Sequence, residues 1–305
     1  MENLETERSQ GRDDLDLRST LDLVRLMNEE DATVPAAVGR ALPAIARAID
    51  AIAQRLAAGG RLVYVGAGSA GRLGVLDASE CGPTYGTPEG QVLGLIAGGP
   101  AAVARPAEGA EDDGGAGAAD LARLGLSAAD AVVGISASGR TPYVLGAVSY
   151  AAAQGALTVG IACNAGTPLS RAVGHPIEVE TGPEIIAGST RLKAGTAQKL
   201  VLNMLSTVVM VRLGKTYGGL MVDLRATSDK LRDRARRIVA QAGRVDDDRA
   251  RAALAEAGGQ VKVAVLMLRC GLPAAAAAAL LDAAGGSLRR ALDQCGPPSS
   301  NAGAP

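Results

Sequence analysis

Short runs of hydrophobic residues alternate with helix-length segments through the middle of the chain. The runs cover residues 62–65, 92–96, 131–135, 157–162 and 177–179. They are almost uninterrupted in apolar residues, which is typical of strands buried on both faces of a parallel sheet. This alternation predicts an α/β fold in which helices cover both faces of the sheet. Ligands of such sheets bind beyond the carboxyl ends of the strands.

Helical patterns flank the predicted sheet. Ser19 is placed to cap a helix over residues 20–30, and Pro35 opens a second helix that reaches about residue 56. Residues 192–213 predict a long, mostly apolar helix. No strand pattern occurs from residue 226 onward, and four segments separated by glycines predict a small helical bundle: 247–257, 259–269, 273–283 and 286–294.

These patterns divide the chain into four expected parts. Residues 1–18 are polar and irregular and predict a flexible arm. The α/β domain with its N-terminal helices is expected over residues 19–225, and the C-terminal helical subdomain over residues 226–295. The final "GPPSSNAGAP", residues 296–305, predicts a disordered tail.

Composition narrows the classes of function. The chain has 305 residues, of which 48% are hydrophobic and 21% charged, as in an ordinary globular protein, and its net charge is −1. Charge therefore gives no argument for a nucleic-acid or membrane partner, and we interpret "RDRARR" at residues 232–237 as a solvated helix face. The N-terminus is polar and no apolar run reaches 18 residues, so we expect neither a signal peptide nor a membrane span.

Cysteine and histidine content restricts the chemistry further. The four cysteines, at positions 81, 163, 270 and 295, form neither a C-x-x-C pair nor a dense disulfide framework, and we expect a reducing, cytoplasmic location. His175 is the single histidine, which excludes a multi-histidine metal site. No G-x-S-x-G motif accompanies it, so a structural or solvent-exposed histidine is the simpler interpretation. We expect no metal and no cofactor.

A glycine-rich loop, "VGAGSAGRLG", follows the first predicted strand. Its glycines spell G-x-G-x-x-G, and backbone N–H groups at the start of the next helix can face an anion there. A dinucleotide site also needs an acidic residue about 20 positions further on. The next acids, Asp77 and Glu80, come too early, in a stretch that we interpret as a helix end and a turn. The loop therefore predicts a phosphate-type site with Gly68, Ser69 and Arg72 as candidate contacts.

Two further polar loops precede predicted helices. After the strand at residues 131–135, "SASGRTPY" places three hydroxyls around a glycine, with Thr141 and Pro142 opening the helix. This pattern fits either phosphate binding or plain helix capping. The segment "GSTRLK", residues 188–193, likewise fits a ligand site or a capped helix with a surface lysine.

Five motifs, taken together and in order, resemble the N-acetylmuramic acid 6-phosphate etherase family, which belongs to the sugar isomerase (SIS) domain superfamily. They are "GAGSAGRLGVLDASECGPTYG", "EGAEDD", "SASGRTPYV", "GSTRLKAGTAQKLVLNMLST" and "GLMVDLRATSDKL". The resemblance extends from about residue 19 to residue 294. Ser69 and Ala70 stand where the family usually has Thr-Ser, and Gly82 stands where proline is usual.

The resemblance implies a SIS-type parallel-sheet sandwich and a cofactor-free lyase of peptidoglycan amino-sugar recycling. Such an enzyme removes the D-lactyl ether of N-acetylmuramic acid 6-phosphate to give N-acetylglucosamine 6-phosphate and D-lactate. Elimination beside the open-chain aldehyde needs a base for the proton on carbon 2 and an acid for the ether oxygen on carbon 3. By resemblance Glu80 is the acid and Glu111 the base, each role being worth roughly 10² to 10⁴ in rate.

The resemblance also implies a sugar-phosphate site and a homodimer that completes it across the interface. The apolar helix at residues 192–213 and the N-terminal helices offer more apolar surface than one sheet covers, which points the same way. The expected substrate contacts are Gly68, Ser69, Arg72, Ser136, Ser138, Gly139, Arg140, Thr141, Ser189, Thr190 and Lys193.

Other interpretations stay open from the residues alone. Glu111 lies in an acidic run that is also typical of an exposed helix end, and Glu108 is a neighbouring carboxylate. A sugar-phosphate-sensing regulator without catalysis would use the same SIS fold. An aldose–ketose isomerase would share the phosphate loops without needing both glutamates.

Overall fold

A computed structural model describes residues 4–224, 226 and 228–295, which fold into two compact units. The first comprises residues 4–79 and 89–209, and the second comprises residues 80–88 and the described residues from 210 onward. The sequence placed this boundary at residues 225 and 226. It comes earlier because Val222 and Leu224 pack into the hydrophobic core of the second unit. The predicted tail, residues 296–305, lies outside the described residues.

The first unit is built on a parallel sheet of five strands in the order β2-β1-β3-β4-β5. The strands are β1 (Leu62–Gly66), β2 (Val92–Ile96), β3 (Ala131–Ile135), β4 (Leu157–Ala162) and β5 (His175–Glu178). In register, Leu62 of β1 lies between Val92 and Ala131. Every residue of β1 and β3 is buried, as their apolar runs predict. The parallel α/β sheet is confirmed.

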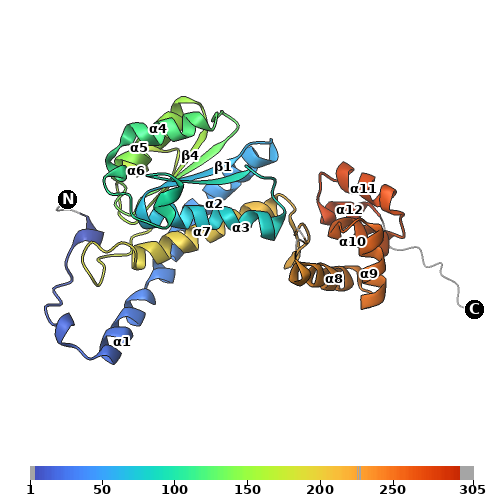
Figure 1. Cartoon of the computed structure of the whole chain (residues 1–305), viewed down its shortest axis with the longest axis horizontal. Helices are drawn as coiled ribbons and strands as arrows, with labels where there is room; N and C mark the ends of the chain where they lie inside the picture. Colours follow the sequence, from blue (N-terminus) through green and yellow to red (C-terminus); the bar gives the residue numbers. More distant parts are fainter. Residues whose placement is uncertain (1–3, 225, 227, 296–305) are drawn as a thin grey trace, which may run out of the picture. The chain divides into compact units, whose positions relative to one another are not determined.

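Helices cover both faces of this sheet (Figure 1). One face carries α4 (Gly114–Arg123), α5 (Pro142–Ala153) and α6 (Pro168–Ala172); the other carries α2 (Val34–Ala57), α3 (Gly68–Tyr85) and α7 (Lys193–Arg212). The Tyr64 hydroxyl of β1 donates to Asp77 of α3 over 2.9 Å, and Ser206 of α7 donates to the same carboxylate over 3.1 Å. These contacts fix α3 against both the sheet and α7.

The helix α7 is long and apolar enough to cross a membrane by length and composition, with a mean hydropathy of 1.2 over its most apolar window. Of that window 56% is buried inside the protein, and the core helix of a soluble protein has the same properties.

The helix α3 corrects one prediction. The residues around Glu80 predicted a helix end followed by a turn, but α3 continues through Glu80 and Pro83 to Tyr85. It stops where Gly86 takes a positive φ of 62° and its N–H bonds the carbonyl of Gly82. Glycine adopts this left-handed conformation readily, so Gly86 rather than Pro83 marks the end of α3.

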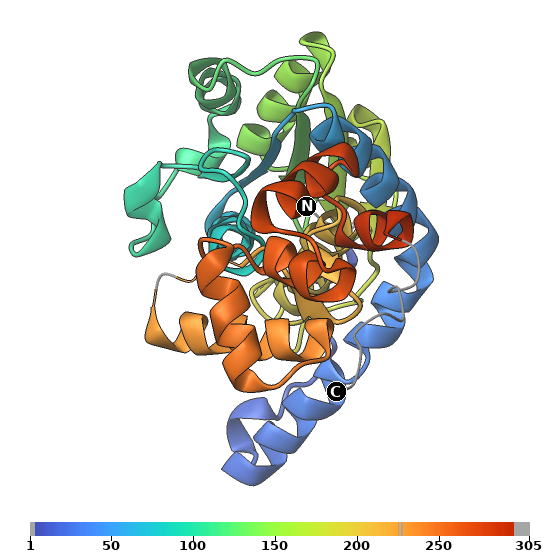
Figure 2. The same cartoon turned by 90° about the vertical axis from the view of Figure 1, so that its right-hand side faces the viewer.

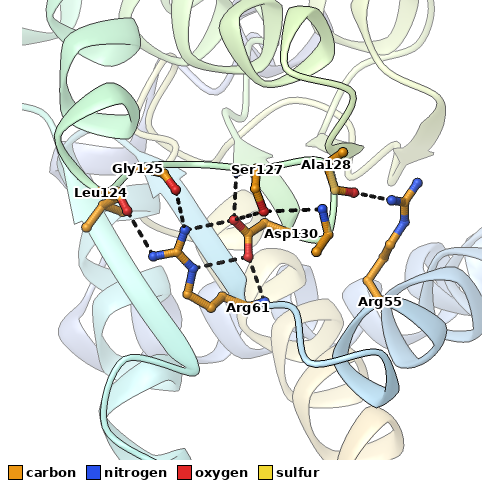
Figure 3. Close-up of polar contacts among 8 residues, drawn as sticks. Arg55, Arg61, Leu124, Gly125, Ser127, Ala128 and Asp130 are labelled. Atoms are coloured by element: carbon orange, nitrogen blue, oxygen red, sulfur yellow. Dashed lines mark hydrogen bonds and ion pairs between the residues drawn. The ribbon is translucent and has the colours of Figure 1, made fainter.

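A polar network ties the amino ends of β1 and β3 together (Figure 3). Arg61, just before β1, donates through Nη2 to Asp130 over 2.8 Å and through Nη1 to the carbonyl of Leu124 over 2.9 Å. The Asp130 carboxylate also accepts the backbone N–H groups of Arg61 and Ser127, both at 2.9 Å. Burial raises the pKa of Asp130, but these hydrogen bonds and the Arg61 charge outweigh it and lower the pKa to about 2.

From residue 4 onward, the N-terminal segment packs against the rest of the first unit. Residues Glu5–Glu7 form a short 3-10 helix whose buried Thr6 exchanges two hydrogen bonds with Asn164, at 3.3 and 3.0 Å. The sequence predicted a flexible arm here because residues 1–18 lack periodicity, and a contact over 158 positions leaves no local signal. The first long helix, α1 (Thr20–Asp31), begins at the Ser19 cap as predicted.

The second unit is a helical bundle with a small hairpin of β6 (Thr216–Tyr217) and β7 (Leu220–Met221), drawn in orange and red in Figures 1 and 2. Its helices are α8 (Asp229–Gly243), α9 (Asp247–Glu256), α10 (Val261–Cys270), α11 (Ala274–Ala283) and α12 (Leu288–Gln294). The sequence patterns predicted four of these segments and missed the hairpin, whose strands are too short to show an apolar period.

One disulfide joins Cys270 to Cys295, whose Cα atoms are 5.8 Å apart. The cysteine spacings predicted neither a C-x-x-C pair nor a dense disulfide framework. The pair forms because α10 packs against α11 and α12, which brings the chain back on itself. Cys81 and Cys163 are buried and are not part of this disulfide. The expected reducing location stays a prediction.

Candidate active site

A cavity of about 410 Å³ opens beyond the carboxyl ends of β1 and β3. These two strands are neighbours in the sheet. From β1 the chain continues to β2 on one side, and β3 with the later strands lies on the other side, so the loops after β1 and β3 lead away from each other. A crevice at such a switch point is where open α/β sheets bind ligands. The residues lining this first cavity are Glu7, Ala67, Gly68, Ser69, Ala70, Glu111, Asp112, Ile135, Ser136, Ala137, Ser138, Arg140, Thr141, Pro142, Thr190 and Gln198.

The glycines of the β1–α3 loop bring the helix start close to the strand. A Cβ at Gly66 would lie 2.6 Å from the backbone nitrogen of Gly71, and one at Gly71 would lie 2.6 Å from Ile96. Gly68 takes a positive φ of 52°. The motif is therefore used for tight helix–strand packing, and Gly68 and Ser69 line the cavity at the N-terminus of α3.

The β3–α5 loop gathers three hydroxyls in one place. The Ser136 side chain is 3% exposed, and its Oγ lies 2.8 Å from Thr141 Oγ1 and 3.3 Å from Ser138 Oγ. Gly139 makes the turn with a φ of 62°, where a Cβ would collide with Thr167 at 2.4 Å. Of the two interpretations of this loop, capping of α5 by Thr141 is not what the structure shows, and phosphate binding stays a prediction. Thr141 is the N-cap residue of α5, yet its side chain makes no capping hydrogen bond.

Three polar residues of the first cavity were missed by the sequence analysis: Glu7, Asp112 and Gln198. Gln198 is 1% exposed, and its Nε2 has no hydrogen-bond partner among the described residues. A buried amide without a partner is costly, so this Nε2 is available to a ligand or a water molecule in the cavity. A polar residue at a buried position of the apolar helix α7 was the available signal. No sequence pattern predicted Glu7, which lines the cavity because the N-terminal segment packs beside it.

A second cavity of about 220 Å³ adjoins the first and shares Ala67, Gly68 and Glu111 with it. Its other lining residues are Arg72, Ala97, Ala102, Pro106, Ala107, Glu108 and Gly109. The loop between two short 3-10 helices, η3 (Pro100–Val103) and η4 (Ala110–Asp112), supplies four of these residues, and each of the two helices supplies one lining residue, Ala102 and Glu111. The side chain of Glu111 is exposed and lines both cavities.

Comparison with known proteins shows the family to which the chain belongs. Residues 44–152 match the N-terminal SIS domain of glucokinase regulatory protein, and residues 116–208 match the SIS domain. An N-acetylmuramic acid 6-phosphate etherase of Streptomyces avermitilis is 61% identical over 279 residues, 92% of this chain and 90% of the relative. One from Rubrobacter xylanophilus is 60% identical over 287 residues, 94% of this chain and 95% of the relative. The chain belongs to the N-acetylmuramic acid 6-phosphate etherase family.

The family membership predicted from the five motifs is thereby confirmed. Among solved structures, a phosphoheptose isomerase from Francisella tularensis is similar with a TM-score of 0.48 and 20% identity, over 64% of this chain and all of that one. At the position where etherases usually have Thr-Ser, Ser69 and Ala70 both line the first cavity, so this chain offers one hydroxyl fewer there.

Not every predicted etherase contact lies in the cavities. Glu80 is exposed on α3, and the described residues that line the two cavities do not include it. Gly139 shapes the hydroxyl loop without lining the cavity, and Ser189 is half-buried beside the lining residue Thr190. Arg72 lines the second cavity rather than the one that holds the hydroxyls. The expected sites at Arg140, Thr141 and Thr190 do line the first.

Lys193 has a structural partner instead of a place in either cavity. Its side chain is buried, and its Nζ lies 2.7 Å from Glu30 of α1, which also pairs with Arg12. Burial raises the pKa of Glu30, but Lys193, Gln10 and Arg12 outweigh it and lower the pKa. The N–H groups of Lys193 and Ala194 are capped by Glu184 at 2.9 Å each. The capped-helix interpretation of "GSTRLK" therefore holds at Lys193, with a buried rather than a surface lysine.

Within residues 4–224, 226 and 228–295 no group of three or more histidine, cysteine or acidic side chains could hold a metal ion. His175 begins β5, away from the residues that line the two cavities.

Proposed function

We propose that this chain is an N-acetylmuramic acid 6-phosphate etherase, a carbon–oxygen lyase. It would release D-lactate from N-acetylmuramic acid 6-phosphate and leave N-acetylglucosamine 6-phosphate. The observation that carries the proposal is identity of 60–61% with relatives of that name over at least 90% of each chain. The regulator and isomerase alternatives have no comparable support along the whole chain.

The first cavity would bind the sugar phosphate. Phosphate oxygens need several donors, and the Ser136, Ser138 and Thr141 hydroxyls lie together at the N-terminus of α5. Arg140 lines the same cavity and supplies a positive charge. The unpaired amide of Gln198 is then free to donate to a sugar oxygen.

Two glutamates would divide the elimination between them. Glu111 accepts the proton from carbon 2, the bond from carbon 3 to the ether oxygen breaks, and Glu80 protonates the departing lactate oxygen. Water then adds at carbon 3 of the unsaturated aldehyde, its proton passes to Glu80, and Glu111 returns a proton to carbon 2, which restores both glutamates. The position of Glu111 at the junction of the two cavities supports its role, whereas the role of Glu80 rests on the family resemblance.

We further propose a cytoplasmic homodimer that shares its active sites and needs no cofactor. Apolar side chains at Leu21, Val24 and Met27 are exposed at helical spacing on α1, and Val208 and Val211 are exposed on α7. Exposed apolar stripes of this kind are often closed by a two-fold partner. Light scattering at micromolar concentration should report twice the chain mass of 30.5 kDa; a mass of one chain with full activity would refute the dimer.

The activity is tested by incubating the purified protein with N-acetylmuramic acid 6-phosphate and measuring D-lactate. The expected result is stoichiometric D-lactate and N-acetylglucosamine 6-phosphate, with little from the unphosphorylated sugar. A protein that binds the substrate and releases nothing would be a regulator, and one that interconverts aldose and ketose phosphates without lactate would be an isomerase.

A further inference from the structure

The second cavity has a cation and small apolar walls. Arg72 lines it together with Ala97, Ala102, Pro106 and Ala107. A guanidinium beside methyl-sized side chains suits a small organic carboxylate, because Arg binds carboxylates through two parallel hydrogen bonds. The volume of about 220 Å³ suits a small group rather than a second sugar phosphate.

The arginine is held in place by the wall itself. Its Nε donates to the carbonyl of Val103, the last residue of η3, over 3.0 Å. The two Nη atoms have no partner among the described residues, so they are available to a ligand. The wall is closely packed at Gly98, where a Cβ would lie 2.4 Å from that of Ala107.

The two cavities meet at Glu111. This carboxylate lines both of them, as do Ala67 and Gly68 at the start of α3. A substrate whose sugar phosphate fills the first cavity would extend a substituent past Glu111 into the second. In the proposed substrate that substituent is the lactyl group on carbon 3, which carries one carboxylate and one methyl group.

We propose that the second cavity is the lactyl subsite, in which Arg72 binds the lactyl carboxylate and the alanine and proline side chains surround the methyl group. This inference rests on the proposed function and moves Arg72 from phosphate binding to recognition of the leaving group. Glu108 lines the same cavity and is exposed. Its charge opposes a bound carboxylate, so Glu108→Gln should lower KM.

The test compares Arg72→Met with Arg105→Met, a matched loss of one arginine charge at a residue that follows η3 and does not line the cavity. Arg72→Met should raise KM for N-acetylmuramic acid 6-phosphate by about 10- to 100-fold, the range for losing hydrogen bonds to a charged group. Binding of N-acetylglucosamine 6-phosphate, which lacks the lactyl group, should change less than about twofold by calorimetry. Arg105→Met should leave both constants unchanged. Arg72→Lys keeps the charge but lacks the planar guanidinium, so its KM should lie between those of the unaltered protein and Arg72→Met.

A substrate analogue with a lactyl carboxamide completes the test. The unaltered protein should discriminate against it by about 10- to 100-fold, and Arg72→Met should lose that discrimination. Equal discrimination by both proteins would overturn the inference, as would an equal loss of N-acetylglucosamine 6-phosphate binding, which would return Arg72 to the phosphate. Both experiments start from an unaltered protein that releases D-lactate. If the unaltered protein released no D-lactate, the proposed function and this inference would both be overturned.

Discussion

Replacing Asp130 with asparagine should destabilise the first unit without touching the chemistry. The carboxylate is 3% exposed and accepts hydrogen bonds from the Arg61 side chain and from two backbone N–H groups. Its pKa falls from 3.8 to about 2, and at about 1.4 kcal/mol per pKa unit this difference corresponds to about 2.5 kcal/mol. For a unit of this size the loss should lower Tm by about 5 to 10 °C.

The pH dependence follows from the sign of the change. Because the pKa of Asp130 is lower in the folded protein than in the unfolded chain, its stabilisation is present above about pH 4 and is lost as the pH falls toward 2. The Tm difference between the unaltered protein and Asp130→Asn should therefore be full at pH 7 and shrink below pH 4.

Thermal unfolding followed by circular dichroism measures this difference. Asp14→Asn is the control, since its pair with Arg18 is solvent-exposed and worth under about 1 kcal/mol. The kcat of the folded Asp130→Asn protein should be unchanged, because the network lies at the amino ends of the strands (Figure 3). An equal Tm for Asp130→Asn and the unaltered protein at pH 7 would refute the reasoning.

Three further predictions concern the active site. Glu111→Gln should block both lactate release and exchange of the carbon 2 proton with solvent, whereas Glu80→Gln should stop lactate release and still permit this exchange. Proton NMR in D₂O measures the exchange, and a wild-type exchange rate in Glu111→Gln would exclude Glu111 as the base. Ser136→Ala should raise KM by about 10-fold or more for the loss of one hydroxyl to a charged oxygen, and equal turnover of phosphorylated and unphosphorylated sugars would contradict the phosphate assignment. Gln198→Leu removes an unpaired buried amide, so Tm should stay level or rise while KM rises; an unchanged KM would show that no ligand atom meets the amide.

The strands could be predicted because their signal is local. β2, β3 and β4 begin and end at the residues that the apolar runs indicate. Strands buried on both faces have few polar residues, and the polar loops beyond them mark their ends. The same loops identified Ser69, Ser136 and Thr141, since a parallel sheet brings the carboxyl ends of its strands to one edge.

The contacts that escaped prediction join residues far apart in sequence. The pair between Lys193 and Glu30 spans 163 positions, and no local pattern distinguishes it from a lysine that reaches a ligand. The same holds for Thr6 with Asn164, which docks the N-terminal segment and brings Glu7 to the first cavity. Local sequence indicates which side chains could do chemistry, and only the packed chain decides which are already paired.

The start of α3 illustrates how one motif serves two cavities. Ser69 and Arg72 are neighbours in "GSAGR", and the sequence assigned both to phosphate. Residues three positions apart on a helix differ by about 60° around the axis and lie almost one turn apart along it, so the two side chains share a face of α3 but reach different places beside it. Ser69 reaches the cavity with the hydroxyl cluster and Arg72 the cavity behind Glu111. Substitutions at these two positions should therefore separate, with Ser69→Ala weakening the binding of any sugar phosphate and Arg72→Met weakening only that of sugars that carry the lactyl group.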